Sequence, residues 1–125
     1  MGKLITEMIA RYAIARSKAR KLNLNEQDYG NEVFIYPENE GVINPKYMSA
    51  FEYNQIVQFH EFLTNHEELS KSDVDEILNA SDRFDFLLML SNSIPNFVEE
   101  LKKHGPKAIA IMYINDKVFS KRLGL

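Results

Sequence analysis

Two histidines and two glutamates near the middle of the chain are the residues best suited to chemistry: His60, Glu61, His66 and Glu67. Two zinc ligands on one helix face the same point when they lie four residues apart. His60 and His66 are six apart, so an ideal helix turns their side chains about 120° away from each other. The spacing argues against a metal centre, and the sequence predicts no catalytic residue, no metal ligand and no cofactor.

A second acidic group, Asp73, Asp75 and Glu76, follows a pair of serines. An EF-hand calcium loop needs alternating acidic residues around a central glycine, and this stretch contains no glycine. Ser70 with Asp73, or Ser72 with Asp75, instead has the spacing of a capping box at a helix start. We therefore predict mainly structural roles for these acids, with an acidic binding face as the functional alternative.

Nucleophilic catalysis has no recognisable motif in the chain. The serines that can be placed precede predicted helices, and neither a Gly-x-Ser-x-Gly turn nor a glycine-rich phosphate loop occurs. We expect a non-catalytic protein, and an enzyme whose site no motif reveals is the third hypothesis.

Charge is distributed unevenly along the 125 residues, whose net charge is −3. Residues 1–22 contain six basic residues and one acidic residue, residues 23–105 five basic and sixteen acidic, and residues 106–125 four basic and one acidic. An acidic middle is thus flanked by basic ends. Such asymmetry bears on association with partners, or with a second copy of the chain, and not on the fold.

The basic face of the first predicted helix is the feature most typical of a binding surface. Together with the acidic group it supplies the predicted partner-binding residues: Arg11, Arg16, Lys18, Arg20, Lys21, Asp73, Asp75 and Glu76. Charged faces steer the association of proteins, so a protein partner is the leading hypothesis. Nucleic acid bound by the basic helix is the alternative, although the acidic balance of the chain argues against it. Docking of the basic helix on the acidic middle of its own chain, or of a second copy in a homo-oligomer, stays open.

The composition is that of one globular domain spanning residues 1–125. With 45% apolar and 26% charged residues, the chain is long enough to bury a single core. Its longest apolar block, Phe86 to Leu90, is too short to cross a bilayer. Because the sequence has no cysteine and no apolar secretion signal, we expect a cytoplasmic protein with no membrane partner.

Apolar periodicity predicts a fold dominated by helices. The stretch 3–22 has one apolar stripe, whereas the apolar residues of 49–65 sweep roughly 240° of the helical wheel, which requires packing on several sides. We expect Ser49 to cap this central helix. Shorter helices are expected after Ser70 or Ser72, after Ser81 or Asp82, and after Ser93, the last ending before Gly105.

Two stretches predict β-hairpins. In 32–45, β-branched and aromatic residues flank turn residues. In 106–123 the apolar residues share no single helical face, whereas a turn at Asn115 and Asp116 would pair Met112 with Phe119. We therefore predict an α+β fold with about five helices around the central one and one or two short hairpins. An all-α fold, with 106–123 as a helix, is the alternative.

The sequence as a whole predicts a small intracellular protein of accessory, regulatory or inhibitor type. We expect it to bind a macromolecular partner without catalysing a reaction. The expected partner is another protein, because charged surfaces steer the association of proteins.

Overall fold

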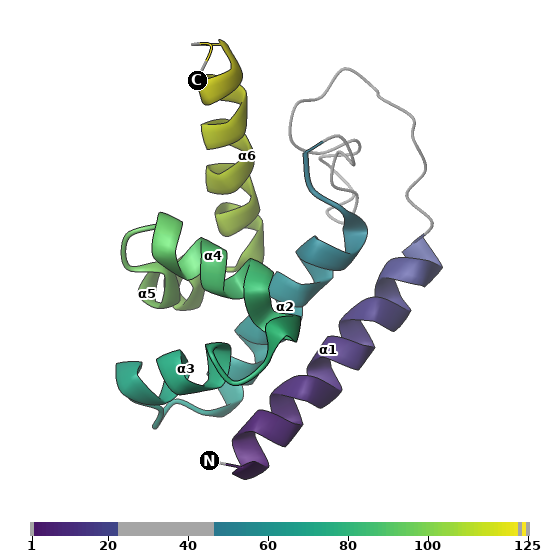
Figure 1. Ribbon diagram of the computed structural model, residues 1–125, viewed down its shortest axis with the longest axis vertical. Coiled ribbons are helices and arrows are strands. Elements are labelled where there is room, and N and C mark those ends of the chain that lie inside the picture. The colour runs from purple at the N-terminus through teal and green to yellow at the C-terminus, as the bar shows by residue number, and fades with distance from the viewer. Residues whose placement is uncertain (1, 23–46, 123, 125) are drawn as a thin grey trace.

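The computed structural model describes residues 2–22, 47–122 and 124, and these residues form helices joined by short turns (Figure 1). Helix α1 spans Gly2–Leu22, α2 Ala50–Asn65, α3 Lys71–Leu78, α4 Asp85–Ser93, α5 Phe97–His104 and α6 Pro106–Arg122, with a 3₁₀ turn at Asp82–Phe84 before α4. The predicted α+β fold is wrong for the described residues, which the all-α alternative fits. The hairpin predicted in 32–45 lies outside them.

Helix α2 is the centre of the fold. Ser49 caps it as predicted, and Glu52 completes a capping box: the Ser49 hydroxyl accepts from the Glu52 backbone N–H at 3.0 Å, and the Glu52 carboxylate accepts from the Ser49 N–H at 2.9 Å. The helix packs against α1, α4, α5 and α6. Phe59 and Phe62 are fully buried, and burial of such a side chain stabilises a fold by about 1.5–3 kcal/mol. The apolar side chains of α2 therefore pack against other helices on several sides.

Helix α1 lies antiparallel along α2, so that its N-terminal end meets the C-terminal end of α2 (Figure 1). Met8 and Ala15 are buried on this side. The Tyr12 ring stands edge-on to Phe51, with ring centroids 5.1 Å apart, and also to Phe84. One apolar stripe thus anchors α1 to the core.

The short helices α3, α4 and α5 begin and end at local signals. Ser70, and not Ser72, caps α3 in a box with Asp73. The predicted helix start at Ser93 is wrong, because α4 continues to this residue and ends where Ile94 becomes extended ahead of Pro95. Helix α5 starts only after Asn96, which has a positive φ of 56°.

Helix α6 replaces the hairpin predicted in 106–123. Gly105, with φ of 86°, ends α5, and Pro106 occupies the first position of α6, where its missing N–H costs nothing. One face of α6 packs on α2 and α5, and it buries Ile109, Ala110 and Ile114. The prediction failed because it required every apolar residue of the stretch to share one helical face. Among the described residues, no helix has both the length and the apolar character needed to span a membrane.

Candidate functional site

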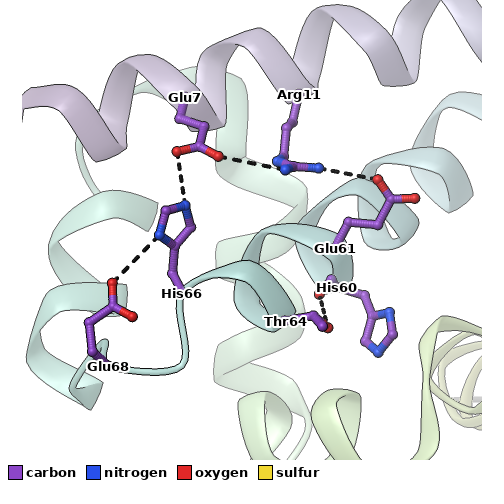
Figure 2. A network of polar contacts seen from close by, with 7 residues as sticks. All are labelled: Glu7, Arg11, His60, Glu61, Thr64, His66 and Glu68. Carbon is purple, nitrogen blue, oxygen red and sulfur yellow. Dashed lines mark hydrogen bonds and ion pairs between the residues drawn. The ribbon is translucent and has the colours of Figure 1, made fainter.

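A network of charged side chains joins α1 to the end of α2 (Figure 2). His66 Nε2 lies 2.8 Å from a carboxylate oxygen of Glu7, and His66 Nδ1 lies 3.6 Å from Glu68. The guanidinium of Arg11 lies 3.6 Å from the other oxygen of Glu7 and 3.1 Å from Glu61. Two cationic or protonatable groups therefore alternate with three carboxylates across the junction of the two helices.

Glu7 is the hub of this network. The hydrogen bond from His66 lowers the pKa of the Glu7 carboxyl below its ordinary value, helped by the charges of His66 and Arg11 and opposed by burial. The His66 ring also packs on Phe62, with ring centroids 4.5 Å apart. Because both ring nitrogens of His66 face carboxylates, neither is left for a nucleophile. The geometry is that of a clamp between helices and not of a general base.

The sequence analysis assigned no role to Glu7 and considered His66 only as a possible metal ligand. Their contact joins residues 59 positions apart. Arg11 was placed among the partner-binding residues, but its side chain is only 16% exposed and is committed to Glu7 and Glu61. The spacing of Glu7 and Arg11, four residues apart on one helix, is the local signal from which this pairing could have been predicted.

His60 lies on a different side of α2 from His66. Its side chain is half-buried, and its ring points away from His66 (Figure 2). It lines a shallow depression with Glu61, Thr64 and Asn65. Within 2–22 and 47–122 no three histidine or acidic side chains are grouped so as to hold a metal ion.

The remaining basic residues predicted to bind a partner lie in the C-terminal half of α1. Arg16 and Lys18 are exposed, and neither forms an ion pair with another described residue. Arg20 and Lys21 belong to the same helix, but their side chains lie outside the described part of the chain. Among the predicted basic residues whose side chains the structure describes, Arg16 and Lys18 are the exposed ones.

The three predicted acidic residues fall into two groups on α3. Asp73 is half-buried and its carboxylate accepts from the Ser70 N–H at 3.1 Å, which completes the cap. Asp75 and Glu76 are exposed. Only these last two offer carboxylates to a partner.

A groove of about 160 Å³ lies between the start of α3 and the start of α5. Lys71 and Lys102 line it together with Asp75 and Glu99. Two charges of each sign give the groove no net preference for an anion or a cation. Its floor includes the buried Phe97, which is part of the core.

Helix α2 also buries polar side chains that its apolar pattern did not predict. Gln55 and Gln58 are 3% and 2% exposed. Gln55 Nε2 donates to the Arg83 carbonyl at 2.9 Å, whereas Gln55 Oε1 and Gln58 Nε2 have no partner within the described residues. A buried amide group without a hydrogen bond costs about 1–3 kcal/mol, so these amides weaken the packing around α2.

The chain matches no model of a known protein family, no curated protein and no solved structure.

Proposed function

We propose that this protein is a non-catalytic, cytoplasmic accessory module that binds an acidic surface of another protein through the C-terminal half of α1. One observation carries the proposal: Arg16 and Lys18 are exposed and unpaired within the described residues, while Arg11 of the same helix is held by Glu7 and Glu61. The helix therefore divides into a half that serves the fold and a half whose charges are available to a partner.

The acidic α3 does not neutralise these cations within the chain. It lies beside the N-terminal end of α1, and the end that follows Arg16 and Lys18 points to the opposite side of the molecule (Figure 1). Exposed cations that are unpaired within the described residues can accelerate encounter with an acidic protein surface, and the effect weakens with salt. This supports α1 as the contact and leaves Asp75 and Glu76 of α3 as a second, separate charged surface.

The test is affinity capture from a lysate of the source cells, with each bound protein quantified. We compare the unmodified protein with the double variant Arg16→Glu, Lys18→Glu. The matched control is Lys102→Glu, Lys103→Glu, which makes the same change in net charge at two exposed residues of α5. One acidic protein should be recovered near stoichiometry, lost at least about tenfold with the α1 variant and retained with the control. Equal loss in both variants, or no enriched protein, contradicts the proposal.

Nucleic acid is the outcome that competes most directly, since the same two cations could contact phosphates. A gel-shift titration with duplex DNA and with single-stranded RNA separates the two. Binding that falls steeply with salt and disappears in the Arg16→Glu, Lys18→Glu variant would replace a protein partner by a nucleic acid.

A further inference from the structure

Helix α1 covers a side of α2 that is partly polar. On this side the Phe51 ring of α2 meets Tyr12 of α1. The Glu61 carboxylate meets Arg11 of α1. Gln58 stands seven residues after Phe51 and three before Glu61, so on an ideal helix it lies between them on the same side. The Gln58 side chain is 2% exposed. The contact between α1 and α2 therefore encloses an amide as well as apolar side chains.

Two buried hydrogen-bond donors of this contact have no acceptor among the described residues. They are Gln58 Nε2 and Arg11 Nε. The other two guanidinium nitrogens of Arg11 are held by Glu7 and Glu61. A donor that leaves water and gains no acceptor opposes the contact that buries it. Helix α1 is therefore held on α2 less firmly than an apolar contact of the same size would hold it.

The rest of the fold has a core that depends little on α1. Within the described residues, Met8 is the one member of the buried apolar cluster that belongs to α1, and the other members lie between Met48 and Ile114. Helix α1 lies along one side of the molecule, where it packs chiefly on α2 (Figure 1). Elements that bury few apolar contacts open at a lower free energy than the whole fold. Helices α2 to α6 can therefore keep their core when α1 leaves.

We propose that α1 undocks from α2 as a unit while α2 to α6 stay folded, and that undocking frees Arg11 for the acidic partner. The second part of the proposal rests on the proposed function, and the first part does not. In the docked state the Arg11 guanidinium lies 3.1 Å from Glu61 and 3.6 Å from Glu7 (Figure 2). Arg11 and Lys18 are seven residues apart, so they lie on one side of α1. Released from α2, Arg11 extends the side of α1 that carries the exposed Lys18.

Competition for Arg11 couples undocking to binding. An acidic partner presents the same carboxylate groups that Glu7 and Glu61 already offer to this guanidinium. Partner carboxylates that take Arg11 bind the undocked form only, so they shift the population of the chain towards that form. The ion pairs that hold α1 in the free protein therefore also set how readily its basic side reaches a partner.

Thiol labelling tests undocking, because the chain has no cysteine of its own. Ala15 of α1 and Ala110 of α6 are both fully buried, so Ala15→Cys and Ala110→Cys make the same change in two different contacts. With an aromatic disulfide reagent, the thiol of Ala15→Cys should react at least about tenfold faster than that of Ala110→Cys. Far-ultraviolet circular dichroism checks that both variants keep the fold. Equal rates overturn the proposal.

Hydrogen exchange of the unmodified protein, resolved by peptide, is a second measurement that needs no variant. A helix as short as α1, with 21 residues, is marginal in water on its own, so its amides exchange once it undocks. Relative to the rates of an unstructured chain, α1 should exchange at least about tenfold faster than the buried middle of α2. Equal protection of the two helices overturns the proposal.

The role of the Arg11 ion pairs is tested in the Ala15→Cys protein. Glu61→Gln removes a charge that holds Arg11, so it should speed labelling at least about threefold, whereas the control Glu76→Gln, at an exposed acid of α3, should not. Equal effects of the two variants overturn this role.

A glutamate decapeptide serves as the acidic probe for the release of Arg11. It should speed labelling of the Ala15→Cys protein beyond the effect of sodium chloride at equal ionic strength, and Arg11→Gln should abolish that acceleration. No acceleration overturns the release of Arg11 to an acidic partner. Labelling and exchange in the absence of the decapeptide need no partner, so slow labelling with successful capture refutes undocking alone. Fast labelling with failed capture refutes the proposed function alone.

Discussion

Helices α2 and α6 are nearly equal in length, 16 and 17 residues, and both have apolar residues around most of the helical wheel. Helix α2 is enclosed by α1, α4, α5 and α6, and its large side chains are buried on several sides. Helix α6 buries Ile109, Ala110 and Ile114 but leaves Ile111 and Met112 partly exposed. A wide apolar arc is therefore compatible with two arrangements: enclosure on several sides, as in α2, or packing that leaves part of the arc exposed, as in α6.

The largest expected effect is in α2. Phe59 is fully buried and stacks on Phe97, with ring centroids 6.0 Å apart. Replacing it with alanine removes this contact and leaves a cavity, so Phe59→Ala should lower the free energy of unfolding by about 3–5 kcal/mol. Urea unfolding followed by circular dichroism measures this loss. A loss below about 1 kcal/mol would mean that α2 is not the enclosed helix of the fold.

The next prediction compares a buried and a partly exposed isoleucine of α6. Ile114→Ala should lower the free energy of unfolding by about 2–4 kcal/mol, because Ile114 is fully buried. Ile111→Ala should lower it by no more than about 1 kcal/mol, because this side chain is 37% exposed. The two variants make the same chemical change, so each is the control for the other. Equal losses would show that Ile111 is packed as tightly as Ile114.

The comparison of α2 with α6 explains which parts of the fold could be predicted from the sequence. Ser49 was predicted as a cap, and Ser70 as one of two possible caps, because capping signals are made by residues close together in the chain and are visible in a sequence. The central position of α2 followed from the width of its apolar arc. The helix at 106–122 was missed because its apolar residues are spread around the helical wheel, and the sequence does not show which of them are buried.

The charged network between the helices could not be predicted for a related reason. His66 and Glu7 meet only because α1 folds back along α2, and nothing in the spacing of either residue records that contact. Arg11 was assigned to the basic face because a sequence shows which side of a helix a charge occupies but not what lies opposite it. Here Glu61 lies opposite.

A smaller effect is expected at the start of α2. Ser49→Ala removes one side of the capping box, so it should cost about 1 kcal/mol of unfolding free energy, which denaturant unfolding resolves. Helix α6 begins at Pro106 directly after Gly105, with no serine or threonine at the cap, so its start depends on the backbone preferences of these two residues. Ser72→Ala, an exposed serine within the first turn of α3 and not at its cap, is the control and should be close to neutral. An equally large loss of unfolding free energy in Ser72→Ala would contradict the role assigned to the capping box.

The smallest expected effect is the pH dependence of the contact between α1 and the end of α2. The pKa of Glu7 is lowered from its ordinary value of 4.5, chiefly by the hydrogen bond from His66, so the ionised carboxylate holds α1 on the end of α2. A carboxyl group with a lowered pKa contributes stability that is present above its unfolded pKa and is lost as the pH falls through its folded pKa. Glu7→Gln should therefore be less stable than the unmodified protein near pH 6, and the difference should shrink below pH 4.5.

The control for this titration is Glu76→Gln, which changes an exposed carboxylate of α3 and should show no such convergence. Hydrogen exchange resolved by peptide adds the comparison between helices. Acid should increase exchange in the paired ends of α1 and α2 before it does so in the buried first half of α6, since the described part of that half has no carboxylate to protonate. Exchange that rises first in α6 would mean that the Glu7–His66 contact does not hold the two long helices together, and that the apolar packing of α1 through Met8 and Ala15 is sufficient without it.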